Sequence, residues 1–491
     1  MSNKNWEALL PYLRRERDLF QLQEILNYDI ATTTPEKEIE RESLLLADLS
    51  NQSAALKKEE GFIKALDAVL ADDSLTPMQH KVAFLEREQT KLFEKMPLEE
   101  YAEYARLLQK SNETWRKYKL ENNFAAWLPH WEKMVEAHKK FLAYQKKDGM
   151  SLYEVGIDLF EKGMNEKKLD EVFGPLKEFL IKKIPEVLKK EEKIAYPKIN
   201  PVDALTQSRI NARLLALINY DMEKGAVRES EHPFSDFVGR NDSRMTTHYY
   251  EEDWRRSCFS ILHEGGHCLE FQNWSEEQFA NFADGIATSA VYETHSRFYE
   301  NIIGRSKEFV PHFKKAAAET LDPSIASWSD EDFYHSINEV RPIMNRCDSD
   351  ELTYCLHIII RYEIERELIN GNIACKDVPS LWNKKYKEYL GVEVTSDREG
   401  CMQDVHWSQG SFGYFPSYAL GNMYGAQILK TIEKDIPFYE LIASGDLSKI
   451  LQWFKEHDYC NDWMNPEDWI KAVTGEPLNP RYYIDYLDSK F

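Results

Sequence analysis

Cysteine is scarce in this sequence, and no two cysteines have the spacing of a metal-binding or redox motif. All seven lie from Cys258 onward, and none belongs to a Cys-x-x-Cys arrangement. An odd number at irregular intervals argues against a disulfide framework and favours reduced thiols. We therefore expect a cytoplasmic protein.

Long hydrophobic runs are absent as well. No stretch of about 18 consecutive apolar residues occurs, so we expect no segment to span a membrane. The opening residues, MSNKNWEALLPYLRRERDLF, are interrupted by charges and are not followed by the apolar core and cleavage site of a secretory signal. Both absences agree with a cytoplasmic location.

Positive charge is in deficit. The chain has 62 lysines and arginines against 84 aspartates and glutamates, which gives a formal net charge of -22. Such a surface repels phosphate backbones and anionic lipids, so we predict no nucleic-acid partner and no membrane partner. The 491 residues, 43% of them hydrophobic, are enough for a large buried core.

Strand patterns are rare in the first 195 residues, which we predict to be mostly long helices. Apolar residues recur there at intervals of three and four, with charged residues between them. Pro77, Pro97 and Pro129 stand at expected helix breaks. The charged and then proline-containing segment 189–201 is the best candidate for a domain boundary, although it could equally be a loop between helices.

Two later segments have a different character. Residues 231–250 suit an extended conformation, in which Asp242, Arg244 and Thr246 would share one face. Residues 391–422 are irregular and rich in glycine and aromatic side chains, and helical periodicity follows them. The sequence therefore predicts a mainly α-helical fold with a small β-sheet.

The segment SCFSILHEGGHCLEFQ, residues 257–272, contains a candidate metal site. On a helix, His263 and His267 lie on the same face and can bind one ion. Glu264 is rotated by about 100°, which keeps it off the metal but near a metal-bound water. The two intervening glycines each cost a helix up to about 1 kcal/mol, which suggests that another backbone or a substrate approaches closely.

A catalytic zinc site of this kind needs a third protein ligand. The downstream segment DGIATSAVYETHSRFYEN is predicted to be helical from about Ala287 and carries Glu293 and His295. These two residues are separated by roughly 200° around a helix, so only one of them can face the histidine pair. The residues alone leave both candidates open.

Six motifs occur in an order that resembles the M32 metallocarboxypeptidases, the thermostable carboxypeptidase family. They are HPF at 232–234, DSRMT at 242–246, HEGGH at 263–267, YETHSR at 292–297, NRCDSDELTY at 345–354 and GCMQDVHW at 400–407. The resemblance implies a single large helical domain over residues 1–491. In that domain, residues 1–195 flank a deep groove, residues 196–491 carry the metal and substrate motifs, and the small sheet lies beside the HEGGH helix.

The resemblance also assigns the third ligand to Glu293 and implies one zinc ion per chain, with cobalt or manganese as possible substitutes. Glu264 becomes the general base. The further residues that it brings to the site are His406, Tyr414 and Tyr418 for catalysis, and Arg346, His232 and Arg244 for substrate binding. Arg346 could bind a free C-terminal carboxylate, but it could also pair with Asp348 or Asp350. Arg244 could instead form a structural pair with Asp242.

The predicted activity is hydrolysis of the C-terminal peptide bond of peptides, releasing single amino acids, by an enzyme that the resemblance implies to be a homodimer. Departures from the family pattern occur at Tyr292, Thr294, His295 and His248. Because three of them flank the third ligand, two alternatives remain. One is a related peptidase that releases dipeptides or cuts internally, and the other is a catalytically silent helical scaffold that binds peptides.

Overall fold

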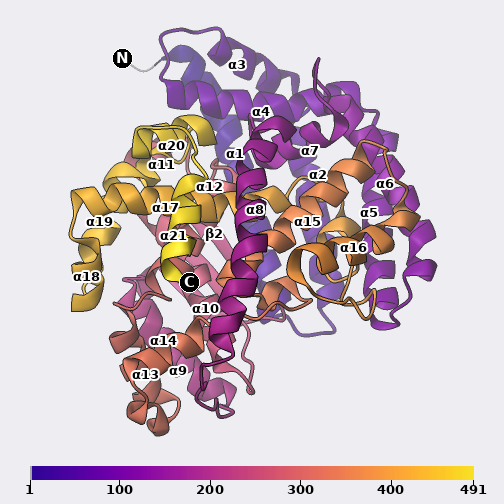
Figure 1. Ribbon diagram of the computed structural model, residues 1–491. Coiled ribbons are helices and arrows are strands. Elements are labelled where there is room, and N and C mark those ends of the chain that lie inside the picture. Colours follow the sequence, from indigo (N-terminus) through magenta and orange to yellow (C-terminus); the bar gives the residue numbers. More distant parts are fainter. Residues whose placement is uncertain (1–2) are drawn as a thin grey trace.

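The computed structural model describes residues 3–491 and confirms a mainly α-helical fold (Figure 1). Within these residues there are twenty-one α-helices and one three-stranded sheet. None of the helices in the described part of the chain is both long enough and apolar enough to cross a membrane.

The N-terminal region consists of eight helices. Most of them occupy the top and right of Figure 1, and α8 runs down its centre. They are α1 (Lys4–Thr32), α2 (Ile39–Leu56), α3 (Glu60–Leu70), α4 (Pro77–Lys95), α5 (Leu98–Leu120), α6 (Phe124–Gln145), α7 (Leu152–Phe160) and α8 (Glu166–Glu191). Two of the predicted proline breaks are confirmed, because Pro77 is the first residue of α4 and Pro97 precedes α5. The third is wrong: Pro129 lies inside α6. The neighbouring side chains of Trp127 and Trp131 are buried and stacked, which offsets the roughly 3 kcal/mol that proline costs inside a helix.

The remaining helices follow the loop after α8. They are α9 (Ala204–Leu217), α10 (Trp254–Asn273), α11 (Glu276–Ala280), α12 (Ser289–Arg297), α13 (Val310–Thr320), α14 (Asp330–Ile337), α15 (Glu351–Ile369), α16 (Val378–Leu390), α17 (Phe415–Asp435), α18 (Phe438–Ser444), α19 (Ser448–His457), α20 (Pro466–Thr474) and α21 (Arg481–Lys490). Short 3-10 turns include η4 (Arg346–Asp348), η6 (His406–Gln409) and η7 (Tyr459–Asn461), and a π-helical turn, η2 (Phe298–Ile303), follows α12.

The sheet has the strand order β1 (Gly225–Glu229), β3 (Asp242–Thr247), β2 (Ser235–Gly239). β3 runs parallel to β1 and antiparallel to β2, with Ser235 opposite Met245. The predicted extended segment at 242–246 is therefore confirmed. The fully buried side chain of Met245 lies on β3, which packs against α10, so the sheet lies beside the helix that carries HEGGH as predicted.

One large hydrophobic cluster contains buried side chains from both sides of the segment 189–201, from Trp115 to Leu487. A smaller cluster joins α1, α3 and α4. Between the N-terminal helices and β2 lies a groove of about 1160 Å³, which we take to be the predicted deep groove. Its walls come from α1, α4, α6 and α7 on one side, and from β2 and residues 282–287 on the other. The organisation as a single domain stays a prediction.

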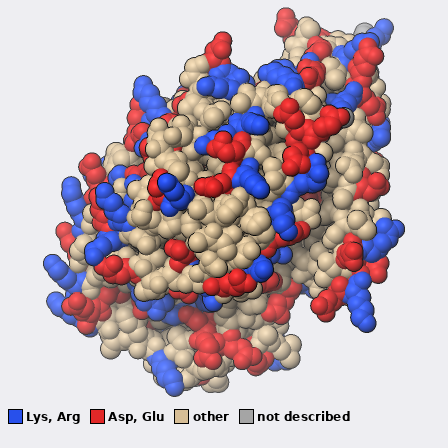
Figure 2. All heavy atoms as spheres, turned by 90° about the vertical axis from the view of Figure 1, so that its right-hand side faces the viewer, with Lys and Arg blue, Asp and Glu red and all other residues tan. Residues whose placement is uncertain are grey.

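On the face drawn in Figure 2, acidic and basic side chains are interspersed around an uncharged central area. No continuous basic area covers this face, and a nucleic-acid backbone would need one.

Candidate metal and active site

Helix α10 presents His263 and His267 on one face. Asp253 caps its N-terminus by accepting a hydrogen bond from the backbone N–H of Arg255, and most of the helix beyond is buried. The two imidazole rings lie with their centroids 5.1 Å apart and their planes at 82°. Spacing of four residues on a helix has therefore brought both rings to the same place, as predicted.

Helix α12 supplies a carboxylate to the same place. Oε2 of Glu293 lies 3.7 Å from Nε2 of His263 and 3.7 Å from Nε2 of His267. One ligand atom from each of the three residues lies within 4.8 Å of the others. His295 faces the opposite way, towards Glu270 and Asp458. The geometry thus selects Glu293 from the two candidates left open by the residues alone.

Glycine allows α10 and α12 to approach closely. A Cβ on Gly266 would lie 2.7 Å from the carbonyl oxygen of His295 and 2.7 Å from Cα of Ser296. A Cβ on Gly421, in α17, would lie 2.8 Å from Cγ of Glu293. Side chains at either position would push α12 away, so the two glycines keep the carboxylate within reach of the histidines. This explains why a helix tolerates the Gly-Gly pair of HEGGH.

A second layer of charged side chains holds the ligands. Glu300 Oε2 lies 2.9 Å from Nδ1 of His263, and Arg297 donates to Oε1 of Glu293 from Nε at 2.7 Å. Arg297 also lies 3.1 Å from Oε2 of Glu300. A carboxylate on the outer nitrogen of a ligating histidine fixes its tautomer and ring orientation.

Arg297 is the last residue of the YETHSR motif, but neither Arg297 nor Glu300 was singled out from the sequence as a functional residue. For Arg297 the signal is its spacing of four residues after Glu293, which places the two side chains on the same helical face. Glu300 lies in the π-helical turn η2, a feature that is often found at functional sites. Burial would raise the pKa of Glu300, but Arg297 and His263 outweigh it and lower that pKa to about 2. Glu300 therefore remains a charged acceptor.

Glu264 is buried beside the ligands. Burial raises its pKa to about 7, although His263 and a hydrogen bond with Ser235 oppose the shift. Ser235 belongs to β2 and lines the groove. Tyr292, which precedes Glu293 in α12, lines the groove as well. The carboxyl group that was predicted as the base is therefore one hydrogen bond away from a residue of the groove wall.

The donor set suits a zinc ion. Two atoms that each lie about 2.0–2.1 Å from a tetrahedral zinc are roughly 3.3–3.5 Å apart, close to the separations between Glu293 and the two histidines. Burial strongly lowers the pKa of His267, which keeps its imidazole neutral and ready to bind a metal. Outer partners are already in place on His263 and Glu293. The residues present therefore fit a His2Glu metal centre.

The comparisons with known proteins agree with this centre. The sequence profile of the family described as "Carboxypeptidase Taq (M32) metallopeptidase" matches residues 8–491. The chain belongs to the M32 family. Among its relatives, Carboxypeptidase 1 of Bacillus subtilis is 36% identical over 95% of this chain and 94% of its own. Thermostable carboxypeptidase 1 of Thermus thermophilus is 31% identical over 99% and 98%.

Solved structures of M32 proteins have the same fold. Pyrococcus furiosus carboxypeptidase superposes with a TM-score of 0.95 at 28% identity, covering 100% of this chain and 99% of that one. Trypanosoma cruzi metallocarboxypeptidase 1 gives a TM-score of 0.94 at 29% identity and covers 100% of both. As an M32 member the chain is a metallocarboxypeptidase, a peptide hydrolase that uses a divalent metal.

The residues predicted from the M32 motif near the C-terminus gather in one cluster. His406 Nε2 lies 3.2 Å from the hydroxyl oxygen of Tyr418, and the ring centroid of His406 lies 5.5 Å from that of Tyr414. Tyr414 and Tyr418 lie at the start of α17, whose Gly421 touches Glu293. Burial lowers the pKa of His406 to about 3, so its imidazole is neutral. His406 packs against Phe415, with ring centroids 4.5 Å apart.

Arg346 is buried at the edge of this cluster. Its guanidinium pairs with Asp404 at 3.1 Å and lies 4.9 Å above the ring of Tyr418. The alternative partners considered for it are wrong. Asp348 pairs with Arg256 instead, and Asp350 caps α15 by accepting from the backbone N–H of Thr353. Sequence reasoning missed Asp404 as the partner, because 58 residues separate the two.

The two other predicted substrate residues have different surroundings. His232 is exposed in the loop before β2, and its carbonyl oxygen accepts from the hydroxyl of Ser230. Arg244 donates to both carboxylate oxygens of Asp242, at 3.0 Å and 2.8 Å. It lines a separate cavity of about 380 Å³ together with Tyr28. The structure thus favours the alternative in which Asp242 and Arg244 form a structural pair.

The departures from the M32 pattern leave the ligand set intact. The hydroxyl of Thr294 donates to the carbonyl of Ala290, and Nδ1 of His248 lies 2.9 Å from the carbonyl of Ser230. Tyr292 packs edge-on against Phe271 and lines the groove. Of the four, Tyr292 is the one that faces the groove, so it is the departure expected to affect substrate preference.

Proposed function

We propose that this protein removes single residues from the free C-terminus of peptides at a zinc centre held by His263, His267 and Glu293. The observation that carries the proposal is the convergence of these three side chains within 4.8 Å, with Glu264 beside them. Ser235, the hydrogen-bond partner of Glu264, belongs to the wall of the groove. A zinc ion bound there would act as a Lewis acid and lower the pKa of its bound water. Cobalt or manganese could replace it in the same donor set.

Glu264 would take up the proton of the attacking water and return it to the leaving amine. A general base works best when its pKa lies near the working pH, and burial raises the pKa of Glu264 to about 7. The neighbouring position on α10 keeps this carboxyl off the ligand set while leaving it close enough to share a water.

His406, Tyr414 and Tyr418 would donate hydrogen bonds to the substrate as negative charge develops on the carbonyl oxygen. Such donors act best when they are fixed and shielded from water before the reaction. All three side chains are largely enclosed, and the neutral imidazole of His406 keeps an N–H to donate. Tyr418 is held between His406 and Arg346.

Arg346 would bind the C-terminal carboxylate of the peptide. A guanidinium can donate two parallel hydrogen bonds to a carboxylate, and that geometry distinguishes a free C-terminus from an internal peptide bond. We do not extend this role to His232 or Arg244, because the first is exposed in a loop and the second is occupied by Asp242.

The test compares one peptide as its free acid and as its C-terminal amide, with the products identified by mass spectrometry. We expect single residues to be released from the acid and almost nothing from the amide. Release of dipeptides would support the related activity, and equal cleavage of the amide would indicate an endopeptidase. Absence of bound metal in folded protein would support the silent scaffold.

The role of Glu264 is tested by Glu264→Gln. We expect this variant to retain about one zinc per chain while kcat falls on the order of 10²–10⁴-fold, since proton transfer is lost and the ligands are not. Glu277→Gln, which changes an exposed glutamate after α10, is the matched control and should keep normal kinetics. Normal turnover in Glu264→Gln would remove this residue from the mechanism.

Two further proposals concern the protein as a whole. We propose a homodimer, which light scattering after size-exclusion chromatography would test, and a cytoplasmic location, which fractionation would test. A monomer at micromolar concentration would overturn the first proposal.

A further inference from the structure

The guanidinium of Arg346 is held along one of its two edges. Nε and Nη2 both lie 3.1 Å from Oδ1 of Asp404, so this carboxylate occupies the side edge. Nη1 donates to the hydroxyl oxygen of Tyr354 at 3.1 Å. Since Nη1 and Nη2 each carry two hydrogens, one N–H on each nitrogen is left over. The remaining N–H of Nη2 lies on the end edge, between Nη1 and Nη2. If Nη1 donates to Tyr354 through its outer hydrogen, the whole end edge is left for a second carboxylate.

Asp404 is itself fixed from the other side. Its second oxygen, Oδ2, lies 2.7 Å from Nε and 2.6 Å from Nη2 of Arg361, a residue with 0% exposure. The carboxylate therefore bridges two buried guanidinium groups, each of which binds a different oxygen. Two positive charges and one negative charge leave one positive charge in excess, and the two arginines hold the pKa of Asp404 below its usual range. A substrate carboxylate would neutralise this excess.

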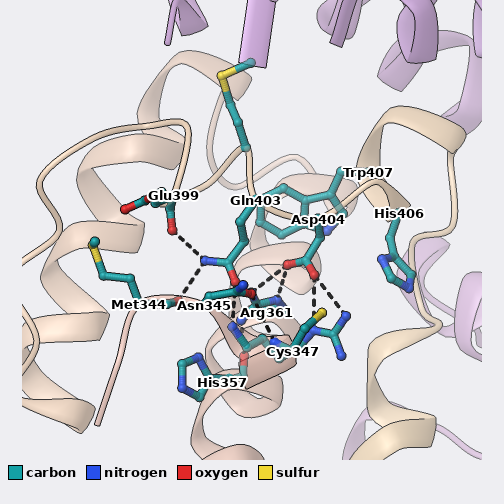
Figure 3. Close-up of polar contacts among 12 residues, drawn as sticks. Met344, Asn345, Cys347, His357, Arg361, Glu399, Gln403, Asp404, His406 and Trp407 are labelled. Carbon is teal, nitrogen blue, oxygen red and sulfur yellow. Dashed lines mark hydrogen bonds and ion pairs between the residues drawn. The ribbon is translucent and has the colours of Figure 1, made fainter. Parts of the chain in front are cut away.

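The backbone that carries Arg346 is fixed by the residue next to Asp404. Gln403 accepts from the backbone N–H of Arg346 at 2.9 Å and donates to the carbonyls of Met344 at 3.0 Å and Glu399 at 2.7 Å. Figure 3 shows Gln403 and Asp404 converging on the segment that carries Asn345 and Cys347. Consecutive residues of one loop thus hold the main chain and the side chain of the same arginine.

We propose that Asp404 is a positioning residue, which turns Arg346 so that its end edge faces the C-terminal carboxylate of the peptide. The proposal rests on the proposed function of Arg346. Asp404 does not touch the substrate. It acts through the orientation of the guanidinium, and Arg361 keeps that orientation rigid. The effect should therefore be on recognition of the substrate carboxylate more than on the chemical step.

The first test measures kcat and KM for a free-acid peptide with Asp404→Asn. We expect KM to rise about tenfold, because one charge-assisted contact on Arg346 is weakened, while kcat stays within about twofold. Asp170→Asn is the matched control, since it removes an aspartate that pairs with Arg366 at 2.8 Å on the exposed side of α8. This control should leave both constants unchanged.

A double-mutant cycle separates positioning from general structural support. Arg346→Ala alone should raise KM about a hundredfold, and Asp404→Asn added to it should raise KM no further, because Asp404 then has nothing to orient. Asp404→Glu, which keeps the charge but moves the carboxylate by one methylene, should also raise KM. Asp404→Asn could leave Arg361 unpaired and so prevent folding, which a thermal-unfolding assay would reveal. In that case Asp404→Glu tests whether Asp404 positions Arg346.

The outcomes distinguish the two proposals. If Arg346→Ala leaves KM unchanged, the carboxylate anchor is wrong, and the role of Asp404 falls with it. If Arg346→Ala raises KM but the folded Asp404 variants do not, only the positioning role is overturned. Additive effects in the cycle, or a fall in kcat without a change in KM, would also overturn it.

Discussion

Two clusters in this protein each place two acidic side chains around one basic side chain, but their surroundings differ. Behind the metal site, His295 lies 2.6 Å from Glu270 and 3.0 Å from Asp458, and all three side chains have 0% exposure. In the N-terminal region, Lys57 pairs with Glu16 and Glu86, whose side chains are 18% and 17% exposed.

The difference lies in what each cluster connects. The first joins α10 and α12, which carry the metal ligands, to Asp458, the residue between α19 and η7. Trp469 of α20 also donates to Asp458 at 3.1 Å. In the second, both glutamates line the groove and can be reached by water. A similar arrangement of side chains therefore fixes α10 and α12 in one region, and forms part of the wall of the groove in the other.

The largest expected effect comes from breaking the sealed cluster with His295→Gln. This change leaves Glu270 and Asp458 buried without a cation, which should cost about 3–5 kcal/mol of the free energy of unfolding. Chemical unfolding measures the loss, and a zinc titration of the folded variant should show weaker binding, because α12 carries Glu293. A loss below about 1 kcal/mol would mean that the cluster does not anchor α12.

The close packing of the ligand helices is tested by Gly266→Ala. The added methyl group would overlap backbone atoms of His295 and Ser296, and such overpacking should cost about 1–3 kcal/mol and reduce zinc affinity. Gly174→Ala is the control. Gly174 lies inside α8, and outside its chain neighbours and its own helix no atom lies within 4 Å of an added Cβ, so alanine there should leave zinc affinity unchanged. Equal effects at both glycines would contradict the packing argument.

Local spacing explains which parts of the site the sequence could predict. His263, His267 and Glu264 follow from positions on one helix, and the opposite orientations of Glu293 and His295 follow from helical geometry. The partners that complete the site are distant in sequence. Asp404 reaches Arg346 across 58 residues, and Asp458 reaches His295 across 163, so no local pattern reveals either pair.

The fold was predictable to a similar degree. Amphipathic periodicity predicted the long N-terminal helices, but Pro129 did not end a helix, because the packing of Trp127 and Trp131 outweighed its local preference. Glu300 depends on a π-helical turn, which periodicity of 3.6 does not predict. Tertiary packing, which is absent from local sequence, decides these cases.

The open cluster should respond less when it loses its cation. In Lys57→Met, the two glutamates can be hydrated from the groove, and Glu16, with a pKa of about 8, keeps its proton at neutral pH. We therefore expect a loss of about 1–2 kcal/mol by chemical unfolding. Zinc affinity should not change, because neither glutamate contacts α10 or α12 through an ion pair. A loss as large as that of His295→Gln would remove the contrast between the clusters.

The smallest effect is a pH dependence at Glu16. Burial raises its pKa from 4.5 to about 8, with Glu86 adding to the shift and Lys57 opposing it. The folded protein therefore keeps this proton after the unfolded chain has released it, so the contribution of Glu16 to stability is complete below about pH 4.5 and is lost as the pH rises towards 8. Glu16→Gln has no proton to lose. The free energy of unfolding of Glu16→Gln, relative to that of the parent protein, should therefore rise by about 1 kcal/mol between pH 5 and pH 9. This is less than the pKa shift of Glu16 would give if it were converted in full into free energy, because groove water and Lys57 support the charged form. If the difference in free energy of unfolding between Glu16→Gln and the parent protein stays constant over this range, Glu16 is ionised in the folded protein throughout. The charge of the open cluster would then depend on pH no more than that of the sealed cluster.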